Sequence, residues 1–84
     1  MPYHKDKQQA FQAAEQNYLQ AKEIFENLDP SSPEYGNYLK RLKKEIIEAE
    51  QTIENALEVS GEKQRMQLYE YREELEKYLQ QLEE

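Results

Sequence analysis

The sequence has no cysteine and no tryptophan, and it contains only two glycines, three prolines and one histidine. Without cysteine, disulfide bridges and thiolate chemistry are excluded, and a reducing compartment such as the cytoplasm is the expected location. So little glycine and proline excludes collagen-like sequences and flexible linkers. Consecutive apolar residues occur in runs of no more than two, so no transmembrane helix or signal peptide is expected.

Acidic residues are in excess, with 18 aspartates and glutamates against 11 lysines and arginines and a net charge of −7. A protein that binds nucleic acid needs a positive surface, and a helix that lies on a membrane needs lysine and arginine on its polar face. Direct binding to nucleic acid or to a membrane is therefore not expected. The main basic cluster spans residues 40–44. Its spacing predicts ion pairs between residues one helical turn apart, Arg41 with Glu45 and Lys44 with Glu48.

Three segments place apolar residues alternately three and four residues apart, the period of an amphipathic helix, and none alternates with the period of a strand. The 84 residues are enough for one domain with a thin core. The predicted fold is an all-α antiparallel three-helix bundle, one domain over residues 1–84 with helices at about 7–28, 33–59 and 62–83. The residues expected to meet in its central seam are Phe11, Tyr18, Phe25, Leu39, Leu42, Ile46, Ile53, Leu68, Leu75 and Leu82.

Helix boundaries follow from capping residues and helix breakers. Asp6 resembles an N-cap of the first helix, and the prolines in the segment 29–33 prevent that helix from continuing. The second helix is expected to be capped by Ser31, which forms a capping box with Glu34, or by Ser32. Gly61 lies where the inward positions become polar, and it suits a left-handed helix terminus.

An alternative architecture uses the same apolar pattern. The stripe of the third segment is in phase with that of the second, so one continuous helix over 33–83 is possible. Such a helix would form a long α-hairpin with the first helix. Its second half would be bare unless two chains dimerised, so the alternative is a dimer of long hairpins.

Catalytic and metal-binding patterns are missing from the sequence. The single histidine, His4, lies near the N-terminus and away from the serines, so no catalytic triad is possible. A di-iron carboxylate bundle needs two Glu-x-x-His pairs, and phosphate-binding loops need more glycine. We expect no enzymatic activity, no bound metal and no cofactor.

Several large apolar residues lie off the seam or reach its edge, where they are candidates for an interface with another protein. Tyrosine is well suited to such contacts, because its ring is rigid and carries a polar end. The chain has seven tyrosines. The candidate interface residues are Leu19, Ile47, Val59, Met66, Tyr69 and Tyr78.

The stretch from Gln64 to Leu75, with its sequence QRMQLYEYREEL, resembles the C-terminal helix of a family of short uncharacterised helical proteins from spore-forming Gram-positive bacteria. The similar part is a QR-x-QLY-x-x-R kernel that follows a short polar break. The resemblance implies a small cytoplasmic bacterial protein. It implies no activity for any residue.

Two functional hypotheses follow from these observations. The first is a non-enzymatic helical module for protein–protein interaction, of unknown pathway, which self-associates as a homo-oligomer such as a dimer. The second is an acidic regulator that occludes a basic surface of a nucleic-acid-binding protein. A contiguous apolar patch favours the first hypothesis, and an acidic face on one side of the bundle favours the second.

Overall fold

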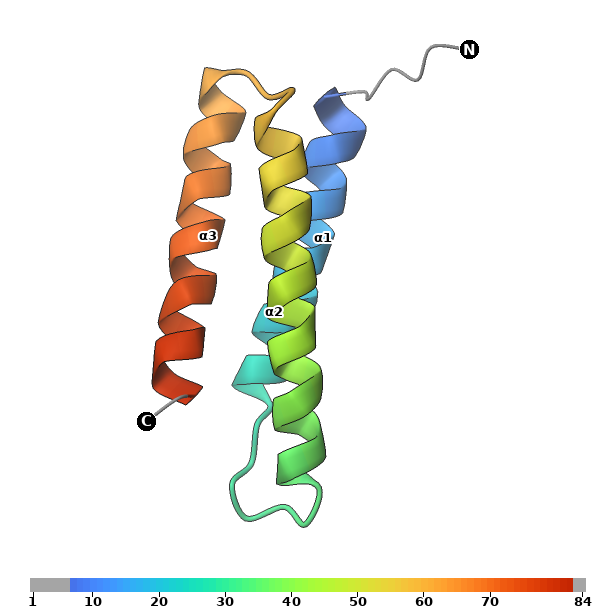
Figure 1. Ribbon diagram of the computed structural model, residues 1–84, viewed down its shortest axis with the longest axis vertical. Coiled ribbons are helices and arrows are strands. Elements are labelled where there is room, and N and C mark those ends of the chain that lie inside the picture. Colours follow the sequence, from blue (N-terminus) through green and yellow to red (C-terminus); the bar gives the residue numbers. More distant parts are fainter. Residues whose placement is uncertain (1–6, 83–84) are drawn as a thin grey trace.

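A computed structural model describes residues 7–82 and confirms the all-α three-helix bundle. Helix α1 spans Lys7–Glu26, α2 spans Tyr35–Leu57 and α3 spans Glu62–Leu82. Neighbouring helices along the chain are antiparallel, so α1 and α3 run in the same direction (Figure 1). All three pairs of helices are in contact. Asp6 and His4 lie outside the described residues.

The helical conformation is interrupted between α2 and α3, and the alternative of one continuous helix over 33–83 is therefore wrong. Helix α2 ends at Leu57, where the backbone N–H of Val59 donates to the carbonyl of Ala56 at 3.1 Å. The Leu57 carbonyl accepts a bond from Arg65 Nη2 at 3.3 Å and one from Ser60 Oγ at 3.4 Å. Side chains thus satisfy a carbonyl that the helix itself leaves unpaired. These bonds explain how the chain leaves α2 at this point.

Gly61 does not adopt the left-handed conformation expected from the sequence. No residue of the described range 7–82, glycine included, has a positive φ. Gly61 instead precedes the first residue of α3, and its carbonyl accepts the backbone N–H of Arg65 at 2.9 Å. It therefore lies at the N-cap of α3, where the helical hydrogen bonds begin. The C-cap residue Glu58 keeps right-handed helical geometry, and the turn that follows is made without a residue of positive φ.

The connection between α1 and α2 is built by short polar side chains. The Asp29 carboxylate accepts the Ser31 backbone N–H at 3.0 Å and the Ser31 hydroxyl at 2.7 Å. These two bonds hold the pKa of the Asp29 carboxyl below its usual value. Ser32 Oγ accepts the backbone N–H of Glu34 at 3.2 Å. Ser31 bonds to Asp29, and the capping box with Glu34 does not form. Ser32 is not the N-cap either, because the N-cap of α2 is Glu34, without a side-chain cap bond, and the helix begins at Tyr35.

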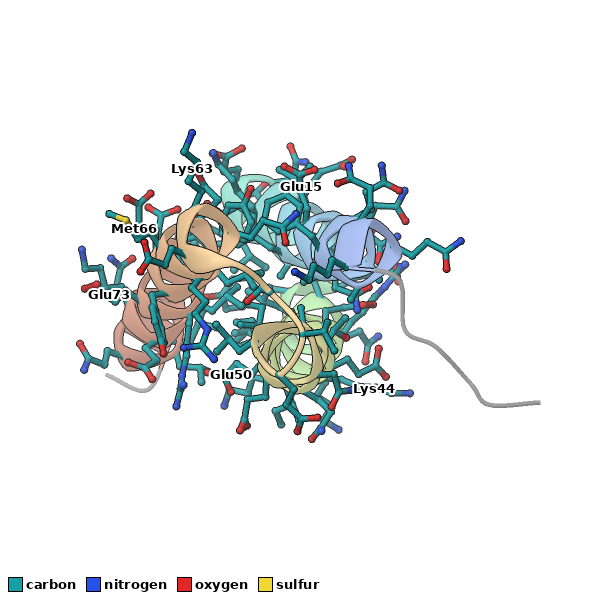
Figure 2. All side chains as sticks on the ribbon, turned by 90° about the horizontal axis from the view of Figure 1, so that it is seen from above. Glu15, Lys44, Glu50, Lys63, Met66 and Glu73 are labelled. Carbon is teal, nitrogen blue, oxygen red and sulfur yellow. The ribbon has the colours of Figure 1, made fainter. Side chains whose placement is uncertain are left out.

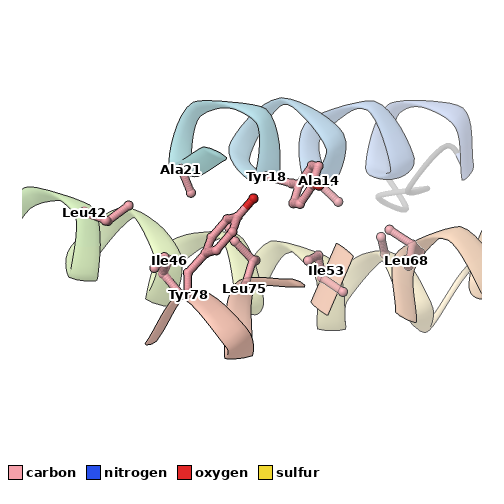
Figure 3. Close-up of a cluster of buried hydrophobic side chains, with 11 residues drawn as sticks. Ala14, Tyr18, Ala21, Leu42, Ile46, Ile53, Leu68, Leu75 and Tyr78 are labelled. Carbon is pink, nitrogen blue, oxygen red and sulfur yellow. The ribbon is translucent and has the colours of Figure 1, made fainter. Parts of the chain in front are cut away.

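The core is a single column of side chains between the three helices (Figure 3). Six of the residues predicted for the seam are buried, and Phe11, Phe25 and Leu82 pack against them while partly exposed. Leu39 is only half-buried and lies outside this cluster. The first turns of α2 extend past the ends of α1 and α3 (Figure 1). Leu39 is the fifth residue of α2 and belongs to this part of the helix. The buried core residues are Ala14, Tyr18, Ala21, Leu42, Ile46, Ala49, Ile53, Ala56, Leu68, Leu75 and Tyr78.

Candidate functional site

The candidate interface residues differ in their exposure. Four of them are exposed, with Leu19 at 49%, Ile47 at 62%, Met66 at 68% and Tyr69 at 48%. Val59 is half-buried in the turn after α2. Tyr38, which the sequence analysis did not select, is also 44% exposed. The exposed apolar side chains therefore come from all three helices.

Tyr78 lies in the core and not on the surface. Only 9% of it is exposed, and its ring stacks on that of Phe25 with centroids 4.1 Å apart and planes 14° from parallel. Such stacking adds to the burial of the two rings and ties α3 to α1. Tyr78 is thus occupied within its own chain and is not available as an anchor for a partner.

Two reciprocal tyrosine–glutamate hydrogen bonds link α1 to α3. The Tyr18 hydroxyl on α1 donates to Glu74 on α3. The Tyr71 hydroxyl on α3 donates to Glu15 Oε2 on α1 at 2.9 Å. Between these bonds the rings of Tyr18 and Tyr71 stack with centroids 4.2 Å apart. The rings fill the apolar gap, and their hydroxyls reach carboxylates at its edge.

Sequence reasoning missed the two glutamates of this cluster. Both are visible in the helical period, since Glu15 precedes Tyr18 by three residues and Glu74 follows Tyr71 by three. Residues three apart share a helix face. The pattern therefore indicates a carboxylate beside each seam tyrosine. Which glutamate bonds to which tyrosine depends on the register between α1 and α3.

Burial and nearby carboxylates raise the pKa values of the three seam tyrosines. For Tyr71, burial and the hydrogen bond to Glu15 raise the pKa to about 12. For Tyr18, burial and Glu74 raise the pKa further. For Tyr78, the pKa is raised by burial and then by the charges of Glu74 and Glu26. At neutral pH these hydroxyls are therefore protonated hydrogen-bond donors, and the stacked pair borders a shallow polar groove of about 280 Å³.

These shifts predict a loss of stability in alkaline solution. Because the folded-state pKa is raised above the ordinary value of 10.0, each tyrosine stabilises the fold fully below pH 10. That stabilisation is lost as the pH rises from 10 through the folded-state values. We expect the melting temperature to fall steeply over this range. In Tyr18→Phe, which lacks one hydroxyl, the fall should be shallower.

The measurement is thermal unfolding followed by circular dichroism across this pH range, read beside the near-ultraviolet absorbance of tyrosinate. Tyr69→Phe serves as the matched control, because Tyr69 is about half-exposed. If Tyr18→Phe and Tyr69→Phe show the same pH dependence as the wild type, the Tyr18 hydroxyl does not carry the effect.

Among the described residues, the basic side chains at positions 40–44 of α2 form no ion pair. Over residues 7–82 the one salt bridge joins Arg72 Nε to Glu76 Oε2 at 3.8 Å. The expected pairs Arg41–Glu45 and Lys44–Glu48 do not form in this structure. The positive charges of the basic side chains at positions 40–44 are therefore exposed to solvent and have no ion-pair partner among residues 7–82.

We define the basic α2 surface as Lys40, Lys43, Lys44 and Ile47, all of which are exposed. The two lysines at 43 and 44 precede Ile47 by four and three residues, so they flank it on one helix face. Figure 2 shows Lys44 pointing away from the bundle. Ile47 thus lies between lysines that precede it and the exposed Glu54, which follows it by two turns on the same helix face.

We define the acidic α3 surface as Glu62, Met66, Tyr69, Glu70 and Glu73, all of which are exposed. Glu62 lies one turn before Met66, and Glu70 lies one turn after it. Glu73 follows Tyr69 by one turn. Figure 2 shows Met66 and Glu73 on the outer side of α3, on a different side of the bundle from Lys44. An exposed apolar pair thus lies among negative charges.

Two of the four basic side chains of α3 contact groups outside the acidic α3 surface. Arg65 donates to the Leu57 carbonyl, and Arg72 pairs with Glu76. Lys63, at the edge of the acidic α3 surface, is exposed. Lys77, which follows Glu73 by one turn, is exposed as well, so the face of α3 around Met66 and Tyr69 carries both signs of charge with glutamates in excess.

Within residues 7–82, no group of three or more histidine, aspartate or glutamate side chains is arranged to hold a metal ion. No helix of this range combines the length and the apolar character needed to cross a membrane. No family model, curated protein or solved structure matches the chain. The resemblance of Gln64–Leu75 to a family of short helical proteins from spore-forming bacteria therefore stays a prediction.

Proposed function

We propose that the protein is a cytoplasmic, non-enzymatic helical module that acts through protein–protein contact and self-associates. The observation that carries this proposal is the exposure of Ile47, Met66 and Tyr69 on a bundle whose core is already filled by its own chain. These side chains do not contribute to closing the core. Large apolar residues that are exposed beside charged groups are typical of the contacts proteins make with one another.

The proposed association is weak. The basic α2 surface offers one large apolar side chain and the acidic α3 surface offers two, which is much less than the core of a permanent interface. A contact of this kind belongs with transient complexes. Its detection needs protein concentrations up to about 1 mM, where a dissociation constant in the millimolar range is still visible.

The measurement is sedimentation equilibrium over a range of concentrations. We expect the average mass of the wild type to rise above 10.1 kDa as the concentration increases. The double variant Ile47→Ala/Met66→Ala should stay closer to the monomer mass, because it removes apolar side chains from both surfaces. A control variant, Gln12→Ala/Gln16→Ala, changes exposed polar residues of α1, which carries neither surface, and should behave as the wild type.

A wild type that stays monomeric at every concentration would refute self-association. The acidic α3 surface would then favour the second candidate, a regulator that covers a basic surface of a nucleic-acid-binding protein. The two candidates differ in the role of α2. Self-association buries the exposed Ile47 of α2, whereas an acidic regulator does not need this residue.

A further inference from the structure

We propose that Glu50, Arg72 and Glu76 form an acid-sensitive contact between α2 and α3, in which protonation of the Glu50 carboxylate tightens α3 against α2. We call these three residues the α2–α3 charge cluster. None of them belongs to the basic α2 surface or to the acidic α3 surface. The response of the bundle to acid is therefore independent of self-association.

Glu50 borders the apolar contact between α2 and α3. It follows the buried Ile46 by four residues and precedes the buried Ile53 by three, so it shares a helix face with both. Glu50 is half-buried, and Figure 2 shows it on the side of α2 that faces α3. Its carboxylate has therefore lost part of its hydration, at a cost that the neutral form largely avoids.

Arg72 occupies the matching position on α3. It follows the buried Leu68 by four residues and precedes the buried Leu75 by three. Arg72 Nε pairs with Glu76 Oε2 at 3.8 Å, one turn further along the same helix. The two side chains are 43% and 55% exposed, so the pair is screened by water and weak. The one cation of the cluster is thus paired within its own helix.

The charges of the α2–α3 charge cluster do not balance. Two carboxylates share a single guanidinium, and Glu50 has no ion pair among residues 7–82. Burial raises the pKa of the Glu50 carboxyl, and the charge of Glu76 raises it further. Arg72 offsets part of this rise in pKa, and Glu54, one turn along α2, adds to it. Excess negative charge therefore lies where α2 and α3 approach each other.

The direction of the pH effect follows from these neighbours. Because the pKa of Glu50 is higher in the folded protein than its ordinary value of 4.5, its protonation stabilises the fold fully below pH 4.5. That stabilisation is lost as the pH rises through the folded-state pKa. At neutral pH the ionised carboxylate repels Glu76 across the contact. Acid removes this repulsion, so α3 is held more firmly on α2.

Glu50→Gln tests the contact, because it keeps the shape of the side chain and removes its charge. At pH 7 its melting temperature should exceed that of the control Glu48→Gln by about 2 °C or more. Glu48 is an exposed residue of α2 outside the cluster, and its substitution changes the net charge equally. As the pH falls from 7 to 4, the difference between the two variants should shrink, since acid also neutralises the Glu50 that the control retains. Thermal unfolding followed by circular dichroism measures both values.

Amide hydrogen exchange at pH 7 shows which helix is tightened. The amides of α3 should exchange more slowly in Glu50→Gln than in Glu48→Gln, because opening of α3 becomes rarer. Both variants are compared at one pH, so the intrinsic exchange chemistry is the same.

A third measurement locates the effect in the cluster. The carboxyl resonance of Glu50 in nuclear magnetic resonance reports its protonation. The pKa of Glu50 should be lower in Glu76→Gln than in the wild type, because the repelling carboxylate is gone and Arg72 remains. Glu62→Gln, which removes an exposed charge in the first turn of α3, should leave the pKa of Glu50 unchanged.

Three results would each overturn the acid-sensitive contact. The first is an equal melting temperature of Glu50→Gln and Glu48→Gln at pH 7. The second is equal exchange of the α3 amides in these two variants. The third is a pKa of Glu50 that does not fall in Glu76→Gln, which would mean that the two carboxylates do not face each other. All three leave self-association intact, since sedimentation equilibrium tests it separately.

Discussion

Leu75→Glu is expected to unfold the whole domain at neutral pH. Leu75 is completely buried in the middle of α3, among the largest side chains of the core. The substitution removes apolar contacts and places a carboxylate in a core where none of the described residues 7–82 is a buried charged group that could pair with it. The loss approaches the whole stability of a small domain, which is about 5–15 kcal/mol.

Circular dichroism at neutral pH measures this outcome directly. We expect Leu75→Glu to lose most of its helical signal, including that of α1 and α2. Gln80→Glu is the matched control, because Gln80 is an exposed residue of the same helix. A Leu75→Glu protein that keeps the melting temperature of the control would show that α3 does not close the core.

Ile46→Ala is expected to cost about 2–5 kcal/mol of unfolding free energy, because it leaves a cavity in the core. Ile46 is completely buried near the middle of α2, while the next residue, Ile47, is 62% exposed. The two isoleucines therefore form an internal comparison. Ile47→Ala should change the free energy by no more than about 0.5 kcal/mol, as is usual for a surface position.

Urea unfolding of the two variants measures both values. The result that contradicts the structure is an equal cost for the two substitutions, or a larger cost for Ile47→Ala. Either would mean that α2 is rotated about its axis relative to the core.

The apolar period predicted the helices and the face that each one buries. Periodicity is set by the geometry of the helix, so it identified Ile46 as buried and Ile47 as exposed without a structure. The helix ends were less predictable. Helix α2 begins at Tyr35 and not at residue 33, and Ser31 bonds to Asp29 where a capping box with Glu34 was expected. A capping motif does not say which of two competing hydrogen bonds its serine will make.

The break near Gly61 was predictable in place but not in conformation. Polar residues at the inward positions showed that the apolar stripe is interrupted there. The interrupted stripe is compatible with either a turn or a continuous helix, because residues on both sides remain in phase. The bonds to the Leu57 carbonyl, which accompany the turn, come from side chains three and eight residues further along the chain.

The candidate surfaces were predictable one residue at a time and not as groups. Exposure of Leu19, Ile47, Met66 and Tyr69 follows from their positions off the stripes. Tyr78 was harder to place, because a seam tyrosine reaches the edge of the core. Its burial depends on the position of Phe25 across the interface between α1 and α3. Likewise, the period pairs Lys44 with Glu48, but it does not tell whether two long flexible side chains stay together.

The packing of α3 onto α1 of the same chain is the central claim of this account, since it leaves only the outer surfaces for a partner. Nuclear Overhauser effects between aromatic rings test it most directly. Phe25 and Tyr78 stack at 4.1 Å, and Tyr18 and Tyr71 stack at 4.2 Å. A mixture of isotope-labelled and unlabelled protein separates contacts within a chain from contacts between chains. We predict strong ring-to-ring effects for both pairs within one chain. Effects that appear only between chains, or that are absent, would contradict the three-helix bundle.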